Sequence, residues 1–182
     1  MNIRIVALAA LLSTGHAVDY SAAALNDEIT SLPGLDISTI DFRLFSGYVD
    51  VSPPSEPSTR SIFYWFVESQ GDASADPLLL WTNGGPGCSG MAGFLTEMGP
   101  FELDAATGSP LLLPREFAWN RLSSMVFIEQ PAGVGFSTAS GAPIAYDDAQ
   151  AAADNARFVE GFLTRFDAYK NADFYLTSES CA

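Results

Sequence analysis

The chain has 182 residues, of which 48% are hydrophobic and 16% charged; this predicts a globular domain of ordinary size and excludes disordered and low-complexity classes. Lys and Arg number 8 against 22 Asp and Glu, for a formal net charge of -14. A surface this acidic repels phosphate backbones and anionic lipid headgroups, so neither nucleic acid nor a membrane is an expected partner.

The first 17 residues are typical of a secretory signal peptide. Arg4 supplies the positive end, residues 5–12 (IVALAALL) form an apolar core, and small residues surround a cleavage point near Ala17. The apolar core is too short to cross a membrane, which needs about 20 residues. We therefore expect residues 18–182 to form the mature domain, in the secretory pathway. His16, the single histidine of the sequence, lies in the segment to be removed.

Five apolar, β-branched or aromatic runs predict strands: Phe42–Val49, Ile62–Val67, Leu78–Trp81, Met125–Ile128 and Phe174–Thr177. A proline-rich turn separates the first two, which predicts an antiparallel hairpin. The later runs are short and almost wholly apolar, as in parallel strands buried on both faces.

Two helices are expected between these strands. Apolar residues recur with helical spacing between Asp147 and Tyr169, and a shorter helix follows Gly90 as far as Glu97. Strands that alternate with helices predict an open α/β sheet with right-handed crossovers.

A glycine-rich loop, Trp81–Gly90 (WTNGGPGCSG), follows the third predicted strand. Its glycines expose backbone N–H groups that can bind an anion or a developing oxyanion, although a tight strand-to-helix connection explains the pattern equally well. A phosphate loop is excluded because its lysine is absent. A second loop, residues 131–137 (PAGVGFS), lacks the third glycine of a dinucleotide fingerprint, since Thr138 stands there, and is predicted to be a structural turn.

The segment 178–182 (SESCA) has the small-x-Ser-x-small form of a nucleophile elbow, in which a strand presents a serine at its end. Ser178 and Ala182 occupy the usual glycine positions, so this match alone is weak. Two cysteines, Cys88 and Cys181, are too few for a disulfide scaffold and lack the spacing of a zinc site. We expect no metal and no cofactor.

Together these segments resemble the serine carboxypeptidase family, a branch of the α/β-hydrolase fold. The resemblance rests on residues 27–34 (DEITSLPG), 45–49 (FSGYV), 63–69 (FYWFVES), 81–90, 97–101 (EMGPF) and 129–137 (EQPAGVGFS), which occur in the order found in the family. The family's elbow, Gly-Glu-Ser-Tyr-Ala-Gly, matches residues 178–182 over its first five positions. The resemblance implies the N-terminal part of a mixed, mostly parallel sheet flanked by helices and truncated at the nucleophile elbow.

The resemblance also implies roles for particular residues. Ser180 matches the acylated nucleophile, and the N–H groups of Gly85 and Cys181 match the oxyanion hole. The positions that hold the terminal carboxylate of a peptide are matched by Asn83, Gly84, Glu97 and Glu179, and Trp81 matches a tryptophan that supports this group. Two acids in close contact are expected to share a proton at mildly acidic pH and to donate it to that carboxylate. Cys88 matches a half-cystine with a downstream partner, so it is either unpaired or bonded to Cys181.

In α/β-hydrolases the triad runs Ser, Asp, His along the chain. Two residues follow Ser180, and neither is an acid or a histidine, so we expect an incomplete, inactive chain with an exposed apolar strand edge. Three functions follow: a secreted, vacuolar or lysosomal carboxypeptidase acting on peptide or protein C-termini, an acyltransferase of the same family, or a non-catalytic secreted binding protein.

Overall fold

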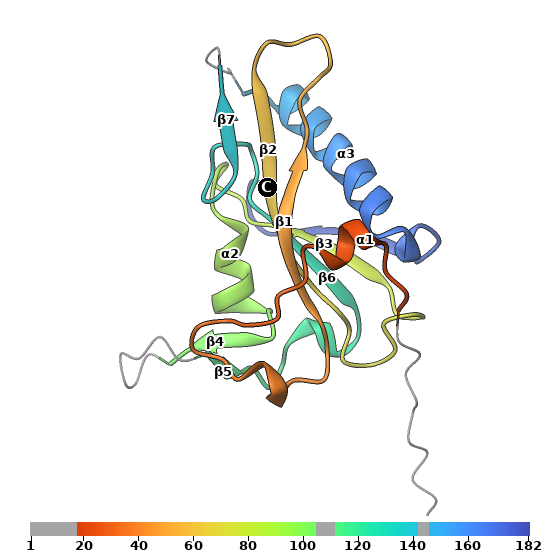
Figure 1. The fold of residues 1–182 in the computed structure, drawn as a ribbon. Coiled ribbons are helices and arrows are strands. Elements are labelled where there is room, and N and C mark those ends of the chain that lie inside the picture. The colour runs from red at the N-terminus through yellow and green to blue at the C-terminus, as the bar shows by residue number, and fades with distance from the viewer. Residues whose placement is uncertain (1–17, 105–111, 142–145) are drawn as a thin grey trace, which may run out of the picture.

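The computed structural model describes residues 18–104, 112–141 and 146–182, so the predicted signal segment 1–17 lies outside the described residues. A sheet with the order β1-β2-β6-β3-β8 forms its centre (Figure 1). The strands are β1 (Leu44–Asp50), β2 (Thr59–Val67), β3 (Leu78–Thr82), β6 (Ser124–Ile128) and β8 (Phe174–Ser178). A further strand, β7 (Thr138–Ser140), pairs with β2, and β4 (Phe101–Leu103) with β5 (Leu112–Pro114) forms a separate pair.

The sheet is mixed, as expected. Strands β1 and β2 form the predicted antiparallel hairpin, and β2 pairs antiparallel with β6. The parallel part consists of β6, β3 and β8, with β3 between the other two. The five strands expected from the sequence are thus confirmed, with ends shifted by a few residues.

One long helix, α3 (Asp148–Arg165), and several short helical segments surround the sheet: α1 (Ala22–Leu25), α2 (Gly90–Ala92), the π-helical turn η2 (Gly93–Glu97), and the 3-10 turns η1 (Ile37–Thr39), η3 (Trp119–Arg121) and η4 (Asp167–Tyr169). The predicted long helix corresponds to α3 and η4. Asp147 caps α3, because its Oδ1 accepts from the Gln150 N–H at 2.8 Å. The predicted short helix corresponds to α2 and η2.

Each face of the sheet has its own core. Alternation along β6 directs Val126 and Ile128 to one face and Met125 and Phe127 to the other. The first face packs against α3, and the second packs against α2 and η2, so that α3 and α2 lie on opposite sides of the sheet (Figure 1). Strand β6 is therefore buried on both faces, as its apolar sequence predicted.

Strand β8 differs from β6 and has the exposed apolar edge that was expected before Ser180. It pairs with β3 on one side and, among the described residues, with no strand on the other. Leu176 is consequently 72% exposed and Tyr175 is 53% exposed. The apolar run predicted a strand correctly, but its burial depends on neighbours that the described residues do not supply.

Tyr20 joins the segment before α1 to the sheet. Its hydroxyl donates to Glu68 Oε1 at 2.6 Å and lies 3.1 Å from the hydroxyl of Tyr169, which contacts Ser124 Oγ at the same distance. Burial raises the pKa of Tyr20, and it raises the pKa of Tyr169 to about 12. Both hydroxyls therefore remain protonated at physiological pH, and the network holds the N-terminal segment against β2 and β6.

Candidate active site

The candidate site lies where three parallel strands end. In the register of the sheet, Thr82 of β3 is beside Ser178 of β8. Asn83 and Glu179, the residues that follow these two strands, therefore lie at the same end of the sheet. The Glu179 N–H donates to Thr82 O at 3.4 Å. The carboxyl ends of parallel strands are where α/β sheets place ligand-binding side chains.

The side-chain amide of Asn83 has a fixed orientation. Its Oδ1 accepts from Trp81 Nε1 and from the Gly93 N–H, each at 3.0 Å. Its Nδ2 consequently faces Glu97 Oε1 at 3.0 Å and Glu179 Oε1 at 3.4 Å. Because Asn83 is 3% exposed, this orientation is protected from exchange with water. The π-helical turn η2 places Glu97 here, and the bond from Gly93 to Asn83 fastens the start of that turn.

Gly84 joins the glycine-rich loop to the end of β8. Its N–H donates to Glu179 Oε1 at 3.4 Å. A Cβ on Gly84 would lie 2.5 Å from Cys181 N and 2.7 Å from Glu179 O, so this position has no room for a side chain. The loop and the segment that carries Ser180 are thus in direct backbone contact, although they are far apart in the sequence.

Ser180 has a φ of 58°, the one positive φ outside glycine among the residues that the structure describes. Non-glycine residues adopt this conformation rarely, and a nucleophile elbow requires it to expose the serine at the end of its strand. The side chain of Ser180 is exposed. The backbone at Ser180 therefore has the left-handed conformation that a nucleophile elbow requires, even though Ser178 and Ala182 replace the usual glycines.

Gly85 follows within the same bend and has a φ of 116°. The Cys88 N–H donates to Gly84 O at 2.9 Å and closes the turn. A pocket of about 470 Å³ adjoins the bend and the elbow; its lining includes Pro86, Gln130, Pro131, Asn155 and Cys181. The site residues expected from the sequence, namely Ser180, Gly85, Cys181, Asn83, Gly84, Glu97 and Glu179, thus all lie on or beside this bend.

The two cysteines remain unpaired. Cys88 and Cys181 are both free and exposed, so the disulfide that the sequence left open is not formed. Among the described residues, no group of three or more His, Cys, Asp and Glu side chains is arranged to hold a metal ion. His16, the single histidine, is outside the part of the chain that the structure describes.

Glu129 was missed by the sequence reasoning. It directly follows β6, is 1% exposed, and accepts hydrogen bonds from the Ser89 hydroxyl and the Phe136 N–H. The available signal was a carboxylate placed at the end of a wholly apolar strand, since charged residues are seldom buried without hydrogen-bonding partners. The loop that follows is a turn, as predicted, with the Ser137 N–H donating to Val134 O at 2.8 Å.

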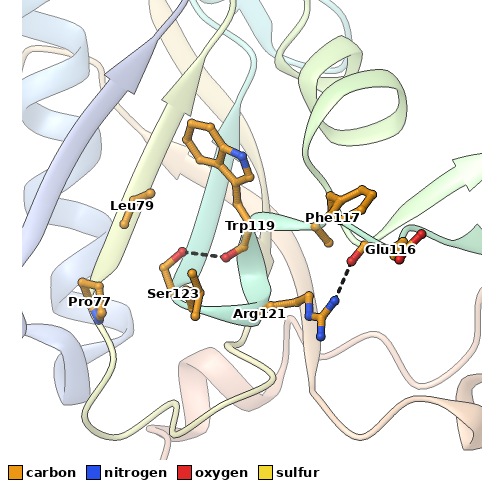
Figure 2. A pocket seen from close by; sticks show the side chains of 9 residues that line it. Pro77, Leu79, Glu116, Phe117, Trp119, Arg121 and Ser123 are labelled. Carbon is orange, nitrogen blue, oxygen red and sulfur yellow. Dashed lines mark hydrogen bonds between the residues drawn. The ribbon is translucent and has the colours of Figure 1, made fainter.

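A larger apolar pocket lies at the opposite end of β3. It encloses about 700 Å³, and Figure 2 shows Leu79, Phe117 and Trp119 around it. Pro77, which precedes β3, lines this pocket, whereas Asn83 follows the last residue of β3. The pocket is therefore separate from the candidate site. No helix among the described residues has the length and apolar character needed to span a membrane.

The model of the family described as serine carboxypeptidase matches residues 33–182. The chain belongs to the serine carboxypeptidase family. It is 42% identical to serine carboxypeptidase-like 27 of Arabidopsis thaliana over 168 residues, covering 90% of this chain and 35% of the relative. It is 40% identical to the lysosomal protective protein of Mus musculus over 174 residues, covering 94% of this chain and 35% of the relative.

A solved structure gives the same fold. The chain superposes on the prohormone-processing carboxypeptidase of Saccharomyces cerevisiae with a TM-score of 0.72 and 26% identity, covering 85% of this chain and 35% of that chain. The fold is that of the N-terminal portion of an α/β-hydrolase. The chain spans about a third of the length of these serine carboxypeptidases.

Proposed function

We propose that this chain carries the acyl nucleophile and the carboxylate-binding site of a serine-type carboxypeptidase, which releases C-terminal residues from peptides and proteins. One observation carries the proposal: Asn83 Nδ2 and the Gly84 N–H converge with Glu97 and Glu179 beside Ser180 in the elbow conformation. Family membership supports the reaction class, and the elbow supports the choice of nucleophile.

In this proposal Ser180 Oγ attacks the carbonyl carbon of the last peptide bond and forms an acyl-enzyme. The N–H groups of Gly85 and Cys181 stabilise the negative charge that develops on the carbonyl oxygen. The amide of Asn83 and the N–H of Gly84 bind the terminal carboxylate. Glu97 and Glu179 contact Asn83 Nδ2 from the side chains of two separate segments and so complete the polar lining of this position.

Activity also requires a general base, which is a histidine in this class of enzyme. The sequence contains one histidine, His16, in the segment that we propose is a signal peptide. We therefore propose that the 182-residue chain alone does not hydrolyse peptides and that residues 18–182 form an incomplete α/β-hydrolase domain. The signal pattern and the likeness to a protein named lysosomal support a place in the secretory pathway, whether secreted, vacuolar or lysosomal.

The amide and acid pair favours a peptide carboxylate over the alcohol acceptor of an acyltransferase, because it binds an anion at the end of the substrate. The test is to purify the protein from its source, measure its intact mass and assay release of the C-terminal residue from a blocked dipeptide. We expect a mass above 19.4 kDa and an activity that Ser180→Ala abolishes. An intact mass that corresponds to a chain ending at residue 182, together with no hydrolysis of the blocked dipeptide, would favour the non-catalytic binding protein instead.

A further inference from the structure

The carboxyl group of Glu129 lies between two loops at the end of β6. One oxygen accepts from the Ser89 hydroxyl and the other from the Phe136 N–H. A Cβ on Gly135 would lie 2.0 Å from Glu129 Oε1, so the carboxyl group also fills the space against that turn. Glu129 is thus a buried acid that the proposed reaction does not use and whose two oxygens each accept a hydrogen bond from a different loop.

Ser89 transmits this contact to the glycine-rich loop. Its Oγ accepts from the Met91 N–H at 3.1 Å and so caps α2, while its proton is donated to Glu129. The next residue is pressed against the same strand end, since a Cβ on Gly90 would lie 2.1 Å from Ile128 O. The C-terminal end of the loop is therefore fastened to the end of β6.

The N-terminal end of the loop is fastened separately. Asn83 accepts from Trp81 Nε1 and from the Gly93 N–H, each at 3.0 Å. Gly84 and Gly85 lie between these two fixed ends. Glycines are the most flexible residues of the chain, so the directions of their N–H groups depend on how firmly both ends are held.

We propose that Glu129 is a positioning residue, which acts through Ser89 to aim the N–H groups of Gly84 and Gly85 at the substrate. The proposal rests on the proposed function of this loop in binding a peptide carboxylate. Small misplacements of binding groups reduce affinity and rate strongly. Glutamine at position 129 keeps the size of the side chain but has one acceptor oxygen instead of two, so it cannot accept from the Ser89 hydroxyl and from the Phe136 N–H at the same time.

The test uses the 182-residue chain and two probes, a blocked dipeptide with a free C-terminal carboxylate and the same dipeptide amidated. NMR titration gives the Kd of each probe and the amide resonances of Gly84 and Gly85. We expect Glu129→Gln and Ser89→Ala each to raise the Kd of the free acid by roughly five- to tenfold and to shift the same glycine resonances. The double variant is expected to bind about as weakly as the weaker single variant, because both changes break one link. Glu160→Gln, an exposed acid on α3, is the matched control and is expected to change neither readout.

Unchanged glycine resonances in Glu129→Gln, or effects that multiply in the double variant, would overturn the inference. If Glu129→Gln does not fold, Ser89→Ala tests the inference by the same two measurements, the Kd of the free acid and the amide resonances of Gly84 and Gly85. If the wild-type chain binds acid and amide equally, the proposed function fails, whereas the resonances of Gly84 and Gly85 in the free protein still decide the role of Glu129. The two proposals can therefore fail independently.

Discussion

Gly84 lies directly against the backbone of Cys181, and a methyl group on Gly84 would come within 2.5 Å of the Cys181 nitrogen. Because the atoms that meet at this point are backbone atoms of the loop and of the Ser180 segment, a methyl group at Gly84 forces the two segments apart. We expect the free energy of unfolding to fall by about 1–3 kcal/mol, measured by urea denaturation. The affinity for a peptide carboxylate, measured by titration, is expected to fall at least about tenfold.

Gly133→Ala is the matched control for Gly84→Ala. Gly133 has a φ of 100°, and a methyl group added there would meet nothing within 4 Å, so this position combines an unfavourable conformation with free space. We expect a cost of about 1–2 kcal/mol from the conformation and no change in carboxylate binding. Equal losses of binding in the two variants would contradict a direct role of the Gly84 contact.

Asn83→Asp tests the orientation of the amide. The aspartate keeps an acceptor for Trp81 Nε1 and the Gly93 N–H, but it loses the Nδ2 donor and brings a third carboxyl group to Glu97 and Glu179. We expect the affinity for a free C-terminal carboxylate to fall more than about tenfold, with a smaller effect on the amidated peptide. Asn171→Asp, at an exposed position, controls for the added charge. Equal affinity for the carboxylate in wild type and Asn83→Asp would refute the assignment.

The sequence predicted the strands that carry large apolar side chains and missed the short ones. Strands β4, β5 and β7 have three residues each, too few to show an alternating pattern. The long helix was predictable because its apolar residues have helical spacing and because the acidic residue Asp147 stands where the helix begins. The short helix that ends at Glu97 was also predicted, but the π-helical form of η2 was not, because local spacing does not show the tertiary bond from the Gly93 N–H to Asn83 at its start.

The residues of the candidate site were predictable, but their contact in space was not. Ser180, Asn83 and the glycines lie in motifs that a reader of the sequence can find. Their contact depends on the pairing of β3 with β8, which no local pattern specifies. The position of Glu129 after an apolar strand was a signal, but its hydrogen bonds were not predictable, because its two partners belong to two different loops that only the fold brings together.

Asp154→Leu tests a buried ion pair on the α3 side of the sheet. Arg60 Nε lies 3.1 Å from Asp154 Oδ2, and each side chain is 1% exposed. Removing the acid leaves the buried Arg60 with one ion-pair partner among the described residues, the partly exposed Glu56. We expect the free energy of unfolding to fall by about 3–5 kcal/mol, and we expect Arg60→Met in the same chain to recover most of that loss. A double variant as unstable as Asp154→Leu would contradict this explanation.

The ion pair of Glu28 and Arg43 predicts a small dependence of stability on pH. The hydrogen bond from Arg43 holds the pKa of Glu28 below its ordinary value. A lowered pKa means that the pair stabilises the fold above the ordinary glutamate pKa and that this contribution is lost as pH falls through the lowered value. Because both side chains are partly exposed, we expect less than about 1 kcal/mol. Melting curves between about pH 6 and pH 3 should show a shallower acid decline in Glu28→Gln than in wild type, and parallel curves would contradict the assignment.

Leu176→Glu tests the exposed edge of β8. Among the described residues this strand pairs with β3 alone, and Leu176 is 72% exposed. Unpaired apolar edges promote association between chains, and a charge placed on them opposes it. Light scattering of the purified chain should therefore rise with concentration more steeply in wild type than in Leu176→Glu. Identical scattering curves would show that β8 does not mediate association.

The placement of β3 between β6 and β8 determines when the chain can acquire its binding site during folding. Leu78 pairs with Phe174 on one side and with Ser124 on the other, and both partners are distant from it in the sequence. Contacts between such distant segments form slowly, because the entropy cost of closing a long loop precedes the free energy that the contacts contribute. Recognition of peptide ends should consequently return late in refolding, after most secondary structure has formed.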